Sequence, residues 1–167
     1  MSNNNSDSIW YALYTKSRAE KKVSEDLNKK GIRNYLPLRR ELRKWSDRKK
    51  WVETPAISSY IFINISPEQY NWVFEINGVV AYVAHNGRAV TIPDNQIKAM
   101  QQTIENKIAF DVESNAITKG KEITISSGPL IGVKGIVKKV KGNRKLYIDI
   151  SNIGYSLVID MEDVEVE

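Results

Sequence analysis

The sequence predicts an α+β protein, with an amino-terminal α/β sandwich followed by a small all-β barrel. Strand-like and helix-like segments are mixed over the first two thirds of the chain. After residue 117 only short strand-like segments remain. A polar stretch without clear periodicity separates the two parts. We therefore expect a polar, disordered lead-in (1–8), an amino-terminal domain (9–107), a linker (108–117) and a barrel domain (118–167).

The first strand and the first helix are expected at the start of the amino-terminal domain. The segment IWYALYTK, residues 9–16, is rich in β-favouring residues and predicts a strand. Ser17 followed three residues later by Glu20 forms a capping-box pattern, which predicts the start of a helix. Gly31 marks its end. An apolar stripe recurs every four residues along this helix: Ala19, Val23 and Leu27.

A long β-hairpin is expected next. Two runs, NYLPLRRELRKW and KKWVETP, flank the turn sequence Ser46-Asp47-Arg48. Residues 39–51, RRELRKWSDRKKW, hold seven Arg or Lys and two tryptophans. We expect five hydrophobic side chains to pack at the base of this hairpin: Leu36, Leu38, Trp45, Trp51 and Val52. For the two tryptophans, the alternative is stacking on unpaired bases.

Two further strands and two further helices complete the amino-terminal domain. SSYIFINI (58–65) and GVVAYVA (78–84) predict strands, and Asn86-Gly87 predicts a tight turn. Ser66-Pro67-Glu68-Gln69 has the cap and the proline of a helix start, and Ile92-Pro93-Asp94 begins the last helix. The residues expected to face inward on these helices are Val73, Phe74, Ile97, Met100 and Ile104.

The barrel domain is predicted from five short runs: KEITISS, GVKGIVKKV, RKLYIDI, YSLVID and DVEVE. Turn sequences separate them, namely Gly128-Pro129, Gly142-Asn143 and Asn152-Ile153-Gly154. No helical pattern competes with strands in this region. Because closure removes exposed strand edges, five short strands in about 50 residues favour a small closed barrel.

Composition argues against several kinds of site. The chain has no Cys, which rules out disulfides and disfavours a zinc site. His85, the one histidine, has no carboxylate pair nearby and is expected to be a surface residue. No phosphate-binding Gly-Lys-Ser/Thr motif occurs. We therefore expect no catalytic residues, no metal and no cofactor.

The chain has no feature that predicts export or a membrane anchor. The start MSNNNSDS is polar and lacks the apolar core of a signal peptide. No apolar run reaches the roughly 18 residues that span a membrane. Together with the absence of Cys, this predicts a cytoplasmic protein, and we expect it to be a monomer.

Positive charge is concentrated in one segment. Residues 16–53 hold 14 Lys or Arg and 6 Asp or Glu, a net charge of +8, whereas the whole chain carries +5. A segment with this bias favours a surface that faces a polyanion. The alternative is a charge-rich face that is merely solvated.

The carboxy-terminal residues resemble a KOW module, the SH3-like barrel at the end of NusG-type transcription elongation factors. The pattern is a Gly-x-x-Val/Ile-x-Ile opening, then Gly-Pro-hydrophobic, then Gly-x-x-Gly-x-Val. The residues that carry it here are Gly120, Ile123, Ile125, Gly128-Pro129-Leu130, Gly132, Gly135 and Val137. Glycines suit barrel corners where backbones approach closely.

The amino-terminal part resembles the NusG amino-terminal domain. Trp10-Tyr11-x-Leu13-Tyr14 is similar to the first strand of that domain, and Glu20-Lys21-Lys22-Val23 to its first helix. Ser59-Tyr60-Ile61-Phe62-Ile63 is similar to a later strand. The basic hairpin, the compact length and the segment NGVVAYVAHNG resemble the specialised RfaH and UpxY paralogues more closely than the housekeeping factor.

The resemblance implies a protein that clamps RNA polymerase. In this family an apolar pocket receives the tip of the β′ clamp helices, and the matching positions here are Tyr14, Ile57, Tyr60, Phe62 and Tyr82. Tyr60 and Phe62 share one face of a strand, so both can line one surface. The alternative is that these residues belong to the core. Trp72 falls where RfaH-like proteins contact the β gate loop.

The resemblance also implies DNA and ribosomal partners. Family members hold upstream duplex or displaced non-template DNA along the first helix and the hairpin, where Lys and Arg neutralise phosphates. The corresponding residues are Lys16, Arg18, Lys22, Arg39, Arg40, Arg43, Lys44, Arg48, Lys49 and Lys50. Leu130 and Ile153 match KOW loops that contact a small-subunit ribosomal protein or Rho, and Leu in place of the usual Phe disfavours Rho.

The function implied is that of a non-enzymatic elongation or antitermination factor that suppresses pausing and termination at particular operons. In the UpxY group those operons make surface polysaccharides. Two alternatives stay open. One is the general NusG housekeeping factor. The other is a KOW-type RNA- or ribosome-binding protein that does not touch polymerase.

Overall fold

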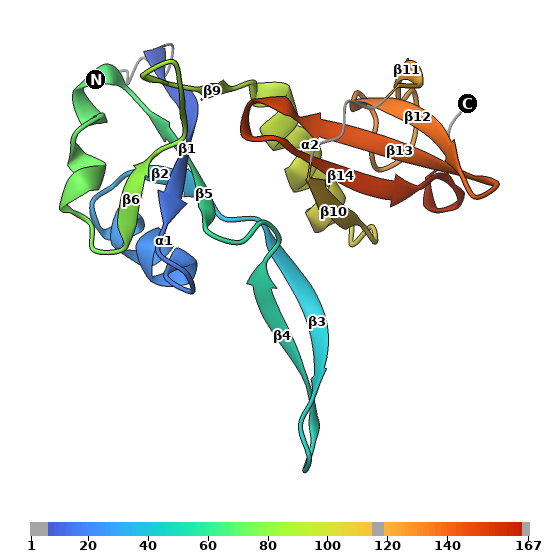
Figure 1. The fold of residues 1–167 in the computed structure, drawn as a ribbon, viewed down its shortest axis with the longest axis horizontal. Coiled ribbons are helices and arrows are strands. Elements are labelled where there is room, and N and C mark those ends of the chain that lie inside the picture. Colours follow the sequence, from blue (N-terminus) through green and yellow to red (C-terminus); the bar gives the residue numbers. More distant parts are fainter. Residues whose placement is uncertain (1–6, 115–118, 165–167) are drawn as a thin grey trace. The chain divides into compact units, whose positions relative to one another are not determined.

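The computed structural model describes residues 7–114 and 119–164 of the 167-residue chain. The chain divides into two compact units, Met1–Thr91 and Ile92–Glu167 (Figure 1). Each unit has its own antiparallel sheet and its own buried side chains. The predicted fold class, a mixed α+β amino-terminal part and a carboxy-terminal β region, is confirmed.

The amino-terminal unit is built on an antiparallel sheet in which the strands follow the order β2-β5-β1-β6. These strands are β1 (Ile9–Thr15), β2 (Arg33–Tyr35), β5 (Tyr60–Ile65) and β6 (Val79–Tyr82). The short β9 (Thr91–Ile92) spans the division between the two units. The first and later strands predicted from the sequence are therefore present, and β1 occupies an interior position in the sheet.

Helix α1 (Glu20–Lys29) packs its apolar stripe on one face of this sheet. Val23 and Leu27 are fully buried in one cluster with Leu13 of β1 and Ile61 of β5. A β-carbon at Gly78 would lie 2.9 Å from Val23 Cγ2, so the contact between this loop and the helix requires a glycine. The predicted stripe is confirmed, and burial of such side chains supplies most of the stability of a short helix.

The predicted Ser17–Glu20 capping box is wrong. The helix begins at Glu20, its N-cap residue is Ala19, and no side chain caps it. The buried Glu20 carboxylate instead accepts a hydrogen bond at 2.8 Å from the backbone N–H of Ser59, 39 residues further along the chain. A long-range partner has therefore replaced the local one that the spacing predicted.

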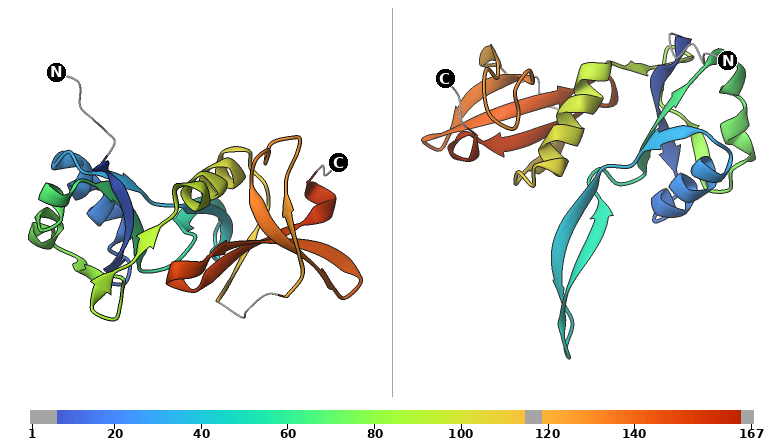
Figure 2. Two further views of the ribbon diagram at one scale, coloured as in Figure 1. Left: turned by 90° about the horizontal axis from the view of Figure 1, so that it is seen from above. Right: turned by 180° about the vertical axis from the view of Figure 1, so that it is seen from behind.

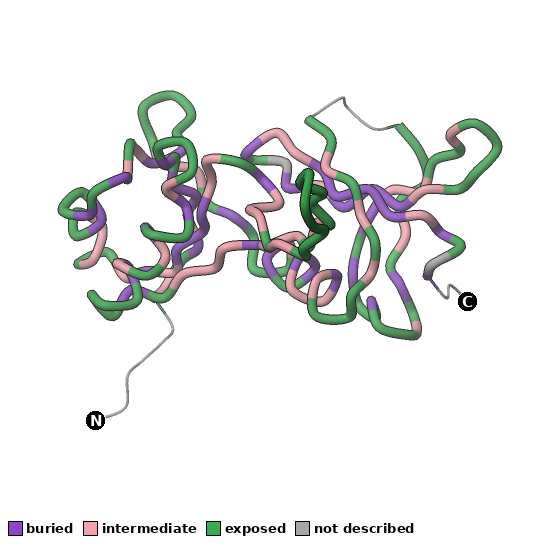
Figure 3. Tube along the Cα trace, turned by 90° about the horizontal axis from the view of Figure 1, so that it is seen from below, coloured by how far each residue is buried: buried purple, intermediate pink, exposed green. Residues whose placement is uncertain are grey.

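The predicted β-hairpin is confirmed as a separate two-stranded sheet, β3 (Leu38–Lys44) with β4 (Lys49–Pro55). Its register runs from Leu38 opposite Pro55 to Lys44 opposite Lys49, and Trp45 N–H donates to the Arg48 carbonyl at 2.7 Å. The hairpin extends away from the sheet of its unit (Figure 2). Every residue from 42 to 51 is exposed (Figure 3).

The segment after β5 keeps its predicted cap but not its predicted helix. Ser66 and Gln69 form the capping box, which is confirmed. Two short 3-10 turns follow, η2 (Pro67–Gln69) and η3 (Trp72–Glu75), instead of one α-helix.

The predicted turn at Asn86-Gly87 joins β7 (Ala84–His85) to β8 (Arg88–Ala89), and both turn residues have positive φ, at 50° and 76°.

The carboxy-terminal unit contains a five-stranded antiparallel sheet of order β10-β14-β13-β12-β11. The strands are β10 (Asp111–Ser114), β11 (Lys121–Thr124), β12 (Lys134–Val140), β13 (Asn143–Ile150) and β14 (Tyr155–Asp160). Two 3-10 turns, η4 (Ser151–Ile153) and η5 (Met161–Asp163), follow β13 and β14. The core includes Ile125, Leu146, Ile148, Leu157 and Ile159.

Two predictions about this unit need correction. Residues 111–114, predicted as part of a structureless linker, form β10 and pair with β14. The fifth predicted strand, DVEVE, begins inside η5, and its last residues lie outside the described part of the chain. The polar segment 111–114 can form an edge strand because its backbone hydrogen-bonds to β14, which does not require an apolar pattern in the segment itself.

Helix α2 (Asp94–Glu105) is grouped with the carboxy-terminal unit, whereas the sequence places it in the amino-terminal domain. Gln102 Nε2 donates to the carbonyl of Ile131 at 3.1 Å. Ile97 and Met100 are buried as predicted, and Ile104 is only partly buried. The predicted domain boundary and the observed unit boundary therefore differ by this one helix. The helix hydrogen-bonds to the loop before β12.

Candidate functional site

The register of β1 against β5 shows which side chains share the sheet face opposite α1. Tyr14 lies opposite Tyr60, and Ala12 lies opposite Phe62. The rings of Tyr14 and Tyr60 are 4.9 Å apart between centroids, with an angle of 52° between their planes. We call this pair the tyrosine pair. It brings together two of the residues predicted to bind polymerase.

The tyrosine pair differs in exposure from the other predicted pocket residues. Tyr14 is 37% exposed and Tyr60 is partly buried. Phe62 shares their face but is fully buried, and Ile57, in the loop before β5, is 2% exposed. Tyr14 and Tyr60 therefore present part of their ring surface to solvent, whereas Phe62 and Ile57 are packed in the interior.

Tyr82 does not lie with the tyrosine pair. It pairs with Leu13, and residues at successive positions of β1 point to opposite faces, so Tyr82 lies on the face covered by α1. Its hydroxyl donates to the carbonyl of Tyr70 at 2.7 Å, and these two rings stack at 4.2 Å. Burial raises the pKa of Tyr82 well above its ordinary value, which keeps the phenol a neutral donor.

The backbone beside the tyrosine pair is held by a specific contact. Ser59 has a positive φ of 66°, an unusual conformation for a residue with a side chain. The Glu20 carboxylate accepts from its N–H, and the Thr15 N–H donates to its carbonyl at 2.9 Å. The second bond ties the residue before Tyr60 to the residue after Tyr14, and the first ties it to the start of α1. Glu20 therefore holds the backbone beside Tyr60 in place, whereas the sequence pattern had assigned it to a capping box with Ser17.

The η3 turn carries a second exposed aromatic surface. Trp72, predicted to meet the β gate loop, is 44% exposed. Phe74 was predicted to lie in the core but is 53% exposed, and its ring makes T-shaped contacts with Tyr82 at 5.7 Å and with Tyr70 at 6.5 Å between centroids. Val73 alone is buried there. A 3-10 turn rotates side chains by about 120° per residue, so helical spacing misplaces Phe74.

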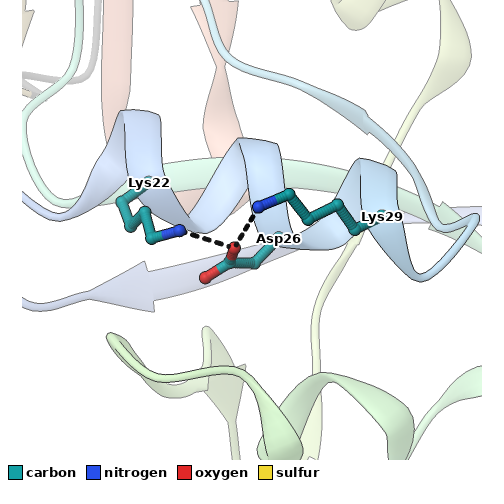
Figure 4. Close-up of polar contacts among 3 residues, drawn as sticks. All are labelled: Lys22, Asp26 and Lys29. Atoms are coloured by element: carbon teal, nitrogen blue, oxygen red, sulfur yellow. Dashed lines mark hydrogen bonds and ion pairs between the residues drawn. The ribbon is translucent and has the colours of Figure 1, made fainter.

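The basic residues near α1 are on the surface. Lys16, Arg18 and Lys22 are all exposed. Lys22 Nζ lies 3.0 Å from Asp26 Oδ1, and Lys29 Nζ lies 3.8 Å from the same oxygen (Figure 4). The hydrogen bond and charge of Asp26 raise the pKa of Lys22. A phosphate that binds Lys22 would therefore compete with an existing, solvent-screened partner.

The hairpin displays the rest of the predicted cationic residues. Arg40, Arg43, Lys44, Arg48, Lys49 and Lys50 are exposed, and Arg39 is partly buried. At the base, Lys21 Nζ of α1 donates to the carbonyl of Glu53 at 2.5 Å. This bond links α1 to the hairpin, so the two predicted DNA-facing elements are joined within one unit.

The prediction that Trp45 and Trp51 pack at the hairpin base is wrong. Trp45 is 46% exposed and Trp51 is 57% exposed. Their partners are arginines: Arg48 Cζ lies 5.7 Å from the Trp45 ring centroid, and Arg40 Cζ lies 5.2 Å from that of Trp51. Guanidinium groups at this distance make favourable contacts with indole rings and leave the other ring face accessible.

The five-stranded sheet of the carboxy-terminal unit and its loops lie where the barrel was predicted, and we call this region the barrel. The two predicted partner-binding residues in it are buried. Leu130 is fully buried and Ile153 is 8% exposed. The neighbour of Leu130, Ile131, is 58% exposed. The loop is closed by hydrogen bonds from Gly132 N–H to the Ile125 carbonyl at 2.8 Å and from Val133 N–H to the Leu130 carbonyl at 3.0 Å. In this conformation the loop offers Ile131, and not Leu130, as its apolar surface.

The described residues contain no group of three or more His, Asp or Glu side chains arranged to hold a metal ion. Within the same residues, no helix is both long enough and apolar enough to cross a bilayer. The surfaces described above offer aromatic rings and fixed positive charge. Exposed rings and cations are features suited to binding a partner.

These features define a class: a two-unit binding protein with an aromatic sheet face, a projecting basic hairpin and a carboxy-terminal β region. The family model "Transcription termination factor nusG" matches residues 8–101. The chain belongs to the NusG family. Members of this family are transcription factors, which confirms the expectation of a non-enzymatic protein. The chain is a NusG-like termination/antitermination factor.

Relatives support this assignment over nearly the whole chain. NusG of Rickettsia typhi is 23% identical over 91% of this chain and 85% of its own length. NusG of Staphylococcus carnosus is 22% identical, with coverage of 95% and 94%. A solved structure concerned with domain interaction in Thermotoga maritima NusG has a TM-score of 0.53 and 20% identity, and covers 93% of this chain and 94% of that one. That likeness concerns the fold.

Proposed function

We propose that this chain binds elongating RNA polymerase at the β′ clamp helices and suppresses pausing and termination. The tip of the clamp helices would rest on the tyrosine pair, with Phe62 and Ile57 as the support beneath it. Bound across the clamp, the protein would stabilise the closed, active state of the enzyme in the cytoplasm, since a ligand shifts a conformational equilibrium toward the state it binds better.

One observation carries this proposal: an aromatic pair is displayed on a sheet face that is otherwise packed. Tyr14 and Tyr60 are partly accessible, while Ala12 and Phe62 on the same face are fully buried. Exposed aromatic side chains on a rigid, packed base are typical of interface residues whose loss weakens binding strongly.

Two further contacts belong to the same proposal. The hairpin and the exposed residues near α1 would lie along upstream duplex or non-template DNA, and Trp72 would face the β gate loop. Exposed Lys and Arg support the DNA contact, because each phosphate that they neutralise releases a counterion. The barrel would contact a small-subunit ribosomal protein through the loops that contain Leu130 and Ile153.

We further propose that the protein is a specialised paralogue, recruited to particular operons such as those for surface polysaccharides. The basic, tryptophan-bearing hairpin supports this. The second candidate is the general factor. It is favoured by the relatives, which are NusG proteins matched over 91–95% of this chain. A template with the DNA upstream of the chain's own operon, compared with an unrelated template, separates these candidates.

The test is single-round transcription with the polymerase of the source organism on a template with pauses and a terminator. We expect wild-type protein to shorten pauses and raise readthrough. Tyr14→Ala/Tyr60→Ala should abolish most of this effect, because losing a buried aromatic contact costs about 2 kcal/mol or more of binding. Tyr14→Phe/Tyr60→Phe, which retains both rings, is the matched control and should act like wild type.

Two outcomes would contradict the proposal. An alanine variant as active as wild type would show that polymerase binds elsewhere. If wild-type protein has no effect on any template, including the DNA upstream of its own operon, the RNA- or ribosome-binding alternative is favoured.

A further inference from the structure

The hairpin has one exposed tryptophan on each of its two faces. Trp51 lies opposite Leu42, and the ladder continues through Lys44–Lys49 to the Trp45–Arg48 pair next to the turn. The two tryptophan positions are three register steps apart. Because side chains alternate from face to face at each step, Trp45 and Trp51 point to opposite sides of the ribbon. Three steps correspond to about 10 Å along the hairpin.

Each tryptophan is accompanied by an arginine on its own face. Arg40 is diagonal to Trp51 across the ladder and lies over its ring at 5.2 Å. Arg48 lies beside Trp45 at 5.7 Å. A guanidinium that rests on an indole is held in place, so less conformational entropy is lost when it binds a phosphate. Each face therefore combines a stacking ring with a pre-positioned cation.

Additional cations flank both tryptophans. Lys44 and Lys49 lie beyond Trp51 on its face, and Arg43 pairs with Lys50 on the face of Trp45. None of these four side chains forms an ion pair with another described residue. Cations without acidic partners, placed opposite one another at cross-strand positions, repel each other until an anion binds between or beside them.

We propose that the hairpin binds a nucleic-acid fork, with one strand on each face. Each face supplies a ring on which an unpaired base can stack and cations for the backbone of that strand. A ribbon only two strands wide is thin enough to enter the angle where a duplex separates. The proposal rests on the assignment of nucleic acid to the hairpin under the proposed function, and it adds the class of ligand: a junction of single and double strands.

A continuous duplex fits the hairpin less well. Its bases are already paired and stacked, so neither indole ring could stack on a base without local unpairing. One single strand can use one face at a time and leaves the other tryptophan in water. An acidic polypeptide would satisfy the charges but gives no reason for a stacking ring on each side. The fork alone uses both faces together.

The test is fluorescence anisotropy with the full chain and three labelled DNAs of equal strand length: a fork with two non-complementary arms, a duplex and a single strand. We expect the fork to bind at least about tenfold tighter than either of the others. Trp45→Ala or Trp51→Ala should weaken fork binding about tenfold and single-strand binding at most about twofold, since one face remains. Trp45→Phe and Trp51→Phe keep a ring and are the controls.

Equal affinity for the fork and the single strand would overturn the proposal. So would single alanine variants that weaken both ligands equally, because that result indicates one continuous site. Binding of an acidic polypeptide such as polyglutamate, together with no binding of any DNA, would overturn it in favour of a protein partner. Naked DNA separates this test from the proposed function: fork binding without an effect on transcription rejects only the polymerase proposal.

Discussion

The hairpin β3–β4 and the barrel pair β12–β13 are similar antiparallel ladders with opposite uses of their apolar side chains. In the barrel, Leu146 is fully buried and Ile148 is 1% exposed. In the hairpin, Leu42 is 44% exposed and Trp51 is 57% exposed. Both ladders pair their strands in a continuous antiparallel register. The contrast indicates that the barrel uses its side chains for folding, whereas the hairpin leaves them accessible to a ligand.

The hairpin must therefore obtain its stability elsewhere, because an isolated two-stranded ribbon is marginal in water. Its base is anchored by two bonds: Ala56 N–H donates to the Pro37 carbonyl at 2.8 Å, and Lys21 donates to the Glu53 carbonyl at 2.5 Å. Beyond the base, arginine–tryptophan contacts add modest stabilisation. Substitutions should consequently affect the two ladders very differently.

Within the two ladders, the largest expected effect is that of Gly135→Ala in β12. A β-carbon at Gly135 would lie 2.6 Å from the Tyr147 carbonyl oxygen and 2.7 Å from Leu146 Cδ1. The backbone atom cannot move without breaking the β12–β13 ladder, so we expect a loss of about 3 kcal/mol in the free energy of unfolding of the barrel. Amide hydrogen exchange of β13 measures this loss. Tryptophan fluorescence would not report on the barrel, because all four tryptophans lie in the amino-terminal unit.

The control for this substitution is Gly142→Ala in the turn between the same two strands. Gly142 has a φ of 87°, and no neighbouring atom lies within 4 Å of the position that a β-carbon would take, so only backbone strain is tested. We expect a loss of about 1 kcal/mol. If Gly135→Ala costs no more than Gly142→Ala, the close approach of the two strands is not what stabilises the barrel ladder.

A matched pair of leucines gives the next largest contrast. Leu146→Ala removes a fully buried side chain from β13 and should cost about 3 kcal/mol. Leu42→Ala removes a side chain that is 44% exposed in β3 and should cost less than about 1 kcal/mol. Urea denaturation followed by far-UV circular dichroism measures both variants. Equal losses would mean that the hairpin packs against a surface that covers Leu42.

The sequence predicted the hairpin correctly because its signals are local. A turn sequence and two flanking strand-like runs determine the register once they pair. The exposure of Trp45 and Trp51 could not be predicted in the same way, because burial depends on whether another element covers the ribbon. The arginines that accompany the rings were visible in the segment 39–51, but the pattern did not show which arginine meets which ring.

Predictions for the proposed polymerase-binding surface show the same limit. Tyr60 and Phe62 were placed on one face by alternation within a strand, and β5 has this arrangement. Tyr82 was grouped with them on resemblance, whereas its face depends on the register of β6 against β1. Glu20 was assigned to a local cap, while its partner, the Ser59 N–H, is 39 residues away. The register between distant strands and hydrogen bonds between distant residues produce no local pattern in the sequence, so sequence analysis could not predict them.

The smallest expected effect on stability is that of Trp45→Ala/Trp51→Ala. Both side chains are about half exposed and touch mainly Arg48 and Arg40, so we expect a change below about 1 kcal/mol in the free energy of unfolding of the amino-terminal unit. Phe62→Ala, in the packed sheet of the same unit, is the reference and should cost about 3–5 kcal/mol. Urea denaturation followed by far-UV circular dichroism compares the two.

A loss above about 2 kcal/mol in the tryptophan variant would mean that the rings hold the hairpin together. The hairpin would then resemble the barrel ladder in the way it uses its apolar side chains, and any loss of DNA binding in that variant would follow from loss of structure.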